Sequence, residues 1–561
     1  IPMADLRHET PEQQAIDMVG GELARRHQIL PLRVVEDDRV QIVTADPLNT
    51  QAIEELTAAC HRIALLVGAP SEIAESIDRS YNELRDAQIH IQAFELAEEV
   101  AEEDDTDNQS YGVDDNAPVV QVVNRIVTQG VRSRASDIHI EPTAHDVRVR
   151  YRVDGAMTEA IRLPLTMASA LASRIKVLAE LNIVERRRPQ DGQFSMSVDN
   201  RQVDVRTSVV ATIHGEKIVL RILDKTRSLI SLRDLGMPDE VVGPYLKIVK
   251  APLGMLLCTG PTGSGKTTTL YATLAEVNDP TKNTVTIEDP VEYQFEGINQ
   301  MQIGDAAGIT FADGLRGILR QDPDVILLGE IRDIETASIA MQAALTGHFV
   351  LSSLHAVDAV AAVHRFTDMG LEPFLVASAV NGVIGQRLIR RICDSCKEPF
   401  RPPSEQARLV AAQLGTKNAT FAHGTGCNQC QGTGYRGRIG VYELLTVSDR
   451  IREMIVDKAT HAEMRKVAVE EGMRTMQYEA FSLVAHGITT VEEVIRSVYA
   501  PGVDLEEAPM GELMPPKLEL GPIPLDGEEY TSEPGEGHGE LPGDVDVRET
   551  SVPPAPWEVG A

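Results

Sequence analysis

The residues most able to do chemistry lie in one glycine-rich stretch, Gly260-Pro-Thr-Gly-Ser-Gly-Lys-Thr267. The spacing fits the pattern G-x-x-x-x-G-K-[ST], in which glycines let successive backbone N–H groups surround phosphates. In such a loop the lysine reaches the terminal phosphates and the following hydroxyl holds Mg²⁺. The sequence therefore predicts a nucleoside triphosphate site with Mg²⁺. Its candidate binding residues are Gly260, Pro261, Thr262, Gly263, Ser264, Gly265, Lys266, Thr267 and Thr268.

The segments on either side of this phosphate loop (residues 260–267) match the elements that must position it. The apolar run Gly254 to Cys258 predicts a short buried strand, and Thr268 to Val277 predicts a helix. The N-terminus of that helix would face the phosphates, where its free N–H groups and dipole favour negative charge. A strand, a loop and a helix in this order make a chance glycine-rich turn improbable.

Carboxylates follow two further apolar runs. Residues 284–287 precede Glu288, Asp289 and Glu292, and a second run starting at Asp324 ends in Glu330. Strands that alternate with helices predict a parallel sheet, whose ligands bind at the carboxyl ends of the strands. We therefore expect Asp289, Glu292 and Glu330 near the phosphates, although the sequence leaves open which acid acts as the base.

A third apolar run, Gly347 to Leu354, ends at His355. In the same sheet, this imidazole could donate a hydrogen bond to a γ-phosphate oxygen. Arg316 and Arg320 are spaced i and i+4, so one helix face presents both guanidinium groups. Such groups suit a phosphate or an opposing carboxylate equally well.

Four cysteines occur as two C-x₂-C pairs separated by thirty residues: Cys393, Cys396, Cys427 and Cys430. Four thiolates at this spacing predict a tetrahedral Zn²⁺ site, with unmetallated cysteines as the alternative. Because four thiolates leave no open position, the zinc would be structural. The glycine-rich segment Gly432 to Gly440 lacks a strand and helix around it, so we expect turns that support the metal site.

Charge and composition argue against nucleic-acid binding and membrane insertion. The net charge of -32 is concentrated in Glu95 to Asp115 and Val503 to Ala561, which together account for 23 of the 32 net negative charges. The remainder is only mildly acidic, and aromatic residues are 4% of the chain, which argues against nucleic-acid binding. No run of 18 apolar residues occurs and no secretory signal opens the chain, so a cytoplasmic protein is expected.

The chain divides into several expected domains. The assignments are a small α/β domain at 1–85, an acidic linker at 86–116, an α+β domain at 117–236, the nucleotide domain at 237–390, a tetracysteine element at 391–445, a helical region at 446–500 and a disordered acidic tail at 501–561. Since the chain begins with Ile1, we expect residues upstream of it to be missing. The first helix is expected from Gln13 to Arg26.

Together these motifs resemble the secretion ATPase superfamily of type II secretion and type IV pilus machines. The resembling segments are a Walker A box at 260–267, an Asp box at 286–292, an atypical Walker B box at 326–330, a His box at 346–355 and stretches at 135–142, 188–192 and 214–221. The tetracysteine element resembles the assembly ATPases rather than the retraction ATPases. Segments 220–225 and 235–237 are more similar to the type II secretion branch than to the pilus extension branch.

The resemblance implies a RecA-like P-loop ATPase domain preceded by an α+β, PAS-like domain, using ATP, Mg²⁺ and Zn²⁺. It implies a homo-hexamer in which Arg206 and Arg221 reach the phosphates of a neighbouring nucleotide domain, while Arg316 and Arg320 stabilise contacts between domains or subunits. Its partners would be the cytoplasmic domains of inner-membrane platform proteins, and membrane association would occur only through them. Pilus extension is the main alternative, and a nucleic-acid motor with the same nucleotide core is a weaker one.

Overall fold

The computed structural model describes most of the first 498 residues, which belong to one compact unit, Ile1–Met510. The second unit, Gly511–Ala561, lies outside the described residues, as do the predicted tail and most of the predicted linker. Within 1–498, the residues not described are 8, 36–38, 61, 82–83, 85–89, 97–116, 200, 225–230, 305–307 and 416–418.

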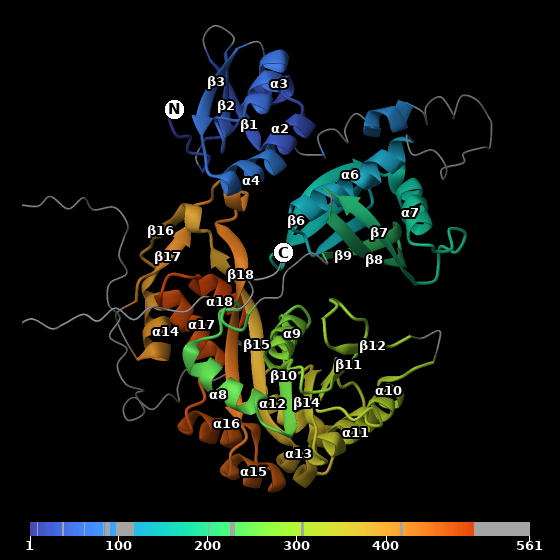
Figure 1. Cartoon of the computed structure of the whole chain (residues 1–561), viewed down its shortest axis with the longest axis vertical. Coiled ribbons are helices and arrows are strands. Elements are labelled where there is room, and N and C mark those ends of the chain that lie inside the picture. Colours follow the sequence, from blue (N-terminus) through green and yellow to red (C-terminus); the bar gives the residue numbers. More distant parts are fainter. Residues whose placement is uncertain are drawn as a thin grey trace, which may run out of the picture. The chain divides into compact units, whose positions relative to one another are not determined.

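The N-terminal segment forms a three-stranded sheet with strand order β1-β2-β3 (Figure 1). Its strands and helices are α1 (Gln13–Met18), α2 (Gly21–His27), β1 (Ile29–Val35), β2 (Arg39–Thr44), α3 (Thr50–Cys60), β3 (Ile63–Val67) and α4 (Pro70–Ser80). Leu30, Ile42, Leu56 and Ile73 lie in one buried core. The α/β expectation is confirmed, but the single first helix is wrong. The chain leaves the helix at Val19 and starts another at Gly21, because adjacent glycines favour a break.

The next segment is an antiparallel six-stranded sheet with order β6-β5-β4-β9-β8-β7. Its elements are α6 (Pro118–Arg132), β4 (Asp137–Pro142), β5 (Asp146–Val153), β6 (Ala156–Pro164), α7 (Met167–Leu178), β7 (Gln190–Val198), β8 (Arg201–Thr212) and β9 (Gly215–Asp224). Alternate residues of β5 are buried, as the sequence pattern predicts. Asp154 and Gly155 both have positive φ angles, 48° and 81°, as a tight hairpin turn requires.

The nucleotide domain is a seven-stranded sheet with order β12-β11-β13-β14-β10-β15-β18. Its strands are β10 (Gly254–Thr259), β11 (Thr284–Glu288), β12 (Asn299–Gln302), β13 (Val325–Leu328), β14 (Phe349–Leu354), β15 (Val380–Ile392) and β18 (Tyr435–Thr446). Its helices are α8 (Asp239–Val249), α9 (Lys266–Val277), α10 (Phe311–Ile318), α11 (Ile334–Leu345), α12 (Ala359–Asp368) and α13 (Pro373–Ala379). The neighbouring strands are parallel except for β15 and β18.

Helices cover both faces of this sheet, which explains why its central strands are continuous apolar runs. On β10, Met255 and Leu257 pack into the core beneath α10 to α13, whereas Leu256 and Cys258 pack into the core beneath α8 and α9. The expected parallel α/β architecture is therefore confirmed. Its parallel strands all deliver their carboxyl ends to one edge.

Two boundaries differ from the sequence analysis. Strand β15 continues to Ile392, and β18 returns antiparallel beside it from Tyr435. The tetracysteine element is therefore inserted between two strands of the nucleotide sheet. The expectation of turns from Gly432 to Gly440 holds only as far as Gly434, because β18 gains hydrogen-bonded pairing with β15.

The remaining elements are β16 (Lys397–Pro399), α14 (Ser404–Leu414) and β17 (Ala422–Gly424), followed by α15 (Asp449–Val456), α16 (His461–Glu470), α17 (Met476–Ala485) and α18 (Val491–Ser497). Each of the last four helices starts after a Ser or Thr whose hydroxyl accepts a backbone N–H from the first turn: Ser448, Thr460, Thr475 and Thr490. Such caps satisfy otherwise unpaired donors, which is why these four helices begin where they do.

Candidate active site

The phosphate loop connects the end of β10 to the start of α9, as its sequence pattern requires. Gly260, Gly263 and Gly265 have φ angles of 152°, 77° and 89°. A Cβ atom at Gly260 would lie 2.5 Å from the carbonyl oxygen of Gln386. These positions therefore need glycine both for conformation and, at Gly260, for close approach of another strand.

Lys266 begins α9, and its side chain folds back over the loop. Its Nζ donates to the carbonyl oxygens of Gly260, at 2.8 Å, and Pro261, at 3.2 Å. Burial lowers the pKa of the Lys266 amine, while the negative charge of Glu330 acts to raise it. Thr267 and Thr268 are exposed in the first turn of α9, where a helix N-terminus favours anions.

Glu330 lies just beyond the end of β13, beside the strand that leads to His355. Its Oε2 lies 3.4 Å from Nε2 of His355, and its Oε1 accepts a hydrogen bond from Nε of Arg332 at 2.8 Å. Arg332 also lies 3.4 Å from Asp289. The structure thus brings together Glu330, His355 and Asp289, which come from three different strand ends.

Tyr271, which no sequence signal singled out, connects the Asp box (residues 286–292) to the helix after the phosphate loop. The Tyr271 hydroxyl, on α9, donates to the buried carboxylate of Glu288 and accepts the backbone N–H of Glu292 at 3.1 Å. Glu288 also accepts the Thr286 hydroxyl at 2.6 Å. The Glu288 carboxylate is therefore held in structural hydrogen bonds, which leaves the exposed Asp289 and the half-buried Glu292 as the remaining acids of the box.

The arginine candidates divide into two groups. Nη2 of Arg206 donates to the Glu292 carboxylate at 3.2 Å, whereas Arg221 donates to Asp137 at 3.0 Å on the strand beside it. Arg316 pairs with Glu335 at 2.5 Å, and Arg320 is exposed. Within this chain, the structure brings Arg206 to the Asp box and does not bring Arg221 there.

Arg387, on β15, is a further cation close to the phosphate loop. Its Nη2 donates to the Val357 carbonyl oxygen at 2.8 Å, and its charge contributes to lowering the pKa of Lys266. Arg387 lies in the middle of its strand, and no local motif marks it. Strand order decides that β15 lies beside β10, the strand that leads into the phosphate loop. The sequence alone therefore could not show that Arg387 lies near Lys266.

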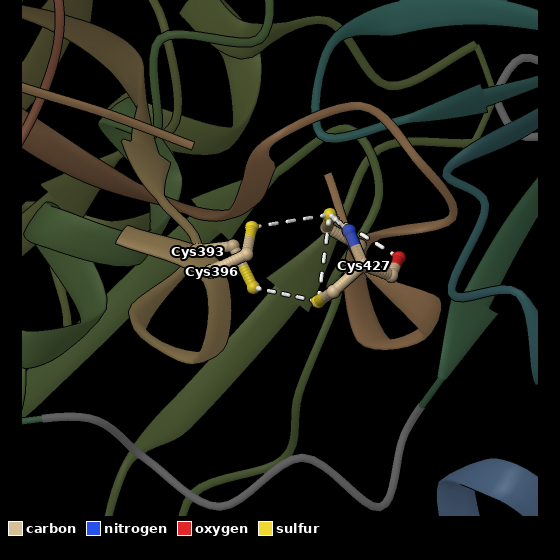
Figure 2. A group of neighbouring side chains, drawn as sticks. Cys393, Cys396 and Cys427 are labelled. Atoms are coloured by element: carbon tan, nitrogen blue, oxygen red, sulfur yellow. Dashed lines mark hydrogen bonds between the residues drawn. The ribbon is translucent and has the colours of Figure 1, made fainter. Parts of the chain in front are cut away.

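The four predicted zinc ligands meet in one cluster, although they come from segments thirty residues apart (Figure 2). All four Sγ atoms lie within 4.8 Å of one another, and three of the pairs are 3.8 Å apart. A tetrahedron with Zn–S bonds of about 2.3 Å has edges of about 3.8 Å, so the spacing fits zinc. A disulfide requires a separation of about 2.05 Å, which excludes that pairing here.

Two backbone donors support this tetracysteine cluster (Cys393, Cys396, Cys427 and Cys430). The N–H groups of Cys427 and Gly434 each lie 3.2 Å from Sγ of Cys430. Hydrogen bonds of this kind stabilise a thiolate, which is the form that binds metal. The residues present therefore fit a closed, structural zinc site rather than a catalytic one.

We expect the purified chain to contain about one zinc ion, and Cys427→Ser to lose most of it. Structural zinc contributes folding free energy, so the variant should also unfold at a lower temperature. Metal analysis by mass spectrometry and thermal unfolding check both results. Cys60→Ala is the matched control, since Cys60 is buried in the N-terminal core away from the cluster. Full zinc content in Cys427→Ser would contradict the assignment.

No helix among the described residues is both long enough and apolar enough to cross a membrane.

Comparisons with known proteins agree with this geometry. Residues 112–496 match the family described as "Type II/IV secretion system protein", and residues 1–87 match the MshEN domain. The chain is 39% identical to the type II secretion system ATPase E of Vibrio cholerae, covering 88% of this chain and 99% of that protein. It is 40% identical to the type IV pilus assembly ATPase PilB of Myxococcus xanthus, covering 88% of each.

Among solved structures, the ATPase DotB of Yersinia pseudotuberculosis aligns with a TM-score of 0.50 and 19% identity. The alignment covers 70% of this chain and 96% of that one. At this identity the likeness concerns the fold alone.

Proposed function

This chain belongs to the type II/IV secretion system protein family, and from that premise we propose that it drives pseudopilus assembly and protein export in a type II secretion system. It is an ATP hydrolase. The observation that best supports the mechanism is the position of Glu330, at a strand end beside His355 and within electrostatic reach of Lys266. Relatives named as type II secretion ATPases match the chain over most of its length.

We assign the roles from this geometry. Lys266 would bind the β- and γ-phosphates, and Glu330 would orient the attacking water, with Asp289 or Glu292 sharing that duty. Mg²⁺, held through the Thr267 hydroxyl, would neutralise charge on the phosphate oxygens. His355 would donate to the γ-phosphate, since it lies next to Glu330. Oxyanion charge that develops during transfer is stabilised most by donors fixed in advance.

Arg206 supports a mechanism that depends on movement. Its guanidinium pairs with Glu292, so it can release that carboxylate and turn to a phosphate when the site closes. A homo-hexamer would allow Arg206 and Arg221 to act on a neighbouring site. Movement of the arginine-bearing segment would then couple hydrolysis to work on a membrane platform, to which the chain would bind from the cytoplasm.

Pilus extension is a second candidate, because the pilus assembly ATPase matches the same share of this chain, at nearly the same identity, as the secretion ATPase. The two functions differ in the partner rather than in the chemistry. The nucleotide site alone therefore does not separate them.

Reconstitution separates the candidates. We expect ATP turnover to rise when the purified chain is mixed with the cytoplasmic domains of type II secretion platform proteins, and not with those of a pilus platform. The control is Lys266→Ala with the same partners, which should show no turnover. Stimulation only by the pilus platform would favour pilus extension, and stimulation only by DNA or RNA would favour a nucleic-acid motor.

A further inference from the structure

A buried glutamine lies directly behind the phosphate loop. Gln386, on β15, is only 1% exposed. Its Nε2 donates to the backbone carbonyl oxygen of Ser264 at 2.6 Å, and its Oε1 accepts the thiol of Cys258 at 3.2 Å. One side chain therefore connects the strand before the loop to the loop itself.

The strand register places Gln386 there. β10 pairs in parallel with β15 so that Thr259 lies opposite Gly385, and the next residues are Gly260 and Gln386. A Cβ atom at Gly265 would lie 3.1 Å from Nε2 of Gln386. The absence of side chains at Gly260 and Gly265 is what lets this strand approach the loop so closely.

The orientation of the amide follows from its two partners. A carbonyl oxygen can only accept, so the amide nitrogen must face Ser264. The amide oxygen then faces Cys258, whose pKa is raised by burial to about 12. The thiol therefore keeps its proton at neutral pH and serves as the donor.

Holding the Ser264 oxygen also fixes the next N–H group. The C=O and N–H of a trans peptide point in opposite directions across a rigid plane. With the Ser264 oxygen held toward β15, the N–H of Gly265 must point away from β15. That is the side of the loop on which phosphates would be bound.

We propose that Gln386 is a positioning residue for nucleotide binding, which fixes the peptide between Ser264 and Gly265 so that the Gly265 N–H faces the phosphates. Gln386 does not itself touch the nucleotide. This inference rests on the proposed nucleotide site at the phosphate loop.

Two substitutions test the role of the amide donor. Gln386→Met keeps the length of the side chain but cannot donate, so affinity for a non-hydrolysable ATP analogue with Mg²⁺ should fall about tenfold, the effect of losing one net hydrogen bond. Gln386→Glu can donate only when protonated. Relative to wild type at the same pH, its affinity should match Gln386→Met at pH 8.5 and approach wild type at pH 6, since burial raises the pKa of such a carboxyl.

The control is Val383→Ala, a buried change on the same strand whose residue pairs with Leu257 rather than with the loop. It should bind the analogue as wild type does. Wild-type affinity for the analogue in Gln386→Met would overturn the inference. So would a Gln386→Glu variant whose affinity at pH 6 is still as low as that of Gln386→Met, because altered packing alone would then explain the loss. Failure of the wild-type chain to bind the analogue would instead overturn the proposed nucleotide site.

Discussion

Glu330→Gln is expected to lower ATP turnover by about 10² to 10⁴-fold while ATP still binds, the range expected when a group that positions or deprotonates the nucleophile is lost. Glutamine has the shape of glutamate but carries no charge and cannot accept a proton. In the proposed mechanism this carboxylate, which lies 3.4 Å from His355 and accepts a 2.8 Å bond from Arg332, would orient the attacking water. Turnover and analogue binding, measured on the same preparation, separate chemistry from affinity.

Glu276→Gln is the matched control for this change. Glu276 is an exposed carboxylate on α9, the helix that follows the phosphate loop. Its substitution should leave ATP turnover within about twofold of wild type, as surface substitutions usually do. Undiminished hydrolysis in Glu330→Gln would show that the Glu330 carboxylate takes no part in ATP hydrolysis. Parallel substitution of Asp289 and Glu292 would then show which acid carries that role.

Lys266→Ala is expected to abolish measurable turnover, by about 10³-fold or more, and to weaken ATP binding. Among the described residues, the amine donates to the carbonyl oxygens of Gly260 and Pro261, which are weaker partners than a phosphate, so a bound phosphate can draw it away. Removing one preorganised donor from a developing oxyanion costs about 10² to 10³-fold, and here the ground-state phosphate contact is lost as well. Turnover and analogue binding again provide the measurement.

The Lys266→Ala variant should remain folded, because alanine is the best helix former at the start of α9. Its zinc content should equal that of wild type, since the first cysteine follows the end of β15 at Ile392, six residues beyond Gln386, which contacts the phosphate loop. Lys282→Ala, an exposed lysine after the same helix, is the control and should keep full activity. Turnover within tenfold of wild type in Lys266→Ala would contradict the assigned site.

These two variants and Gln386→Met should give three different patterns. Glu330→Gln should bind ATP without hydrolysing it, and Lys266→Ala should do neither. Gln386→Met should hydrolyse ATP at saturation but need more of it, because its defect lies in binding. If Gln386→Met behaved like Glu330→Gln, the buried amide would instead act on the chemical step.

The sequence by itself determined the elements whose cause is local. The loop 260–267 needs glycines for its positive φ angles, and the paired C-x₂-C motifs create ligand turns within a few residues. Continuous apolar runs identified the buried strands of the nucleotide sheet. Acids at the ends of Val325–Leu328 and Thr284–Glu288 could be placed at one edge, because parallel strands share a direction.

Two predictions were wrong because local patterns were followed: one continuous first helix, and turns instead of strand β18 from Tyr435 to Gly440. A helical pattern does not show that Gly20 and Gly21 interrupt it, and glycines at 432–440 resemble a loop until β15 pairs with them. Local preferences are worth fractions of a kcal/mol per residue, so tertiary pairing overrides them.

Only the tertiary structure decided which side chains meet. In the folded chain Arg206 pairs with Glu292, Arg221 pairs with Asp137, and the Tyr271 hydroxyl donates to Glu288. It also placed Gln386 against Ser264, 122 positions earlier in the chain. The physical reason is that strand order and register set these contacts. Register depends on how whole elements pack, and no local pattern around either residue contains that information.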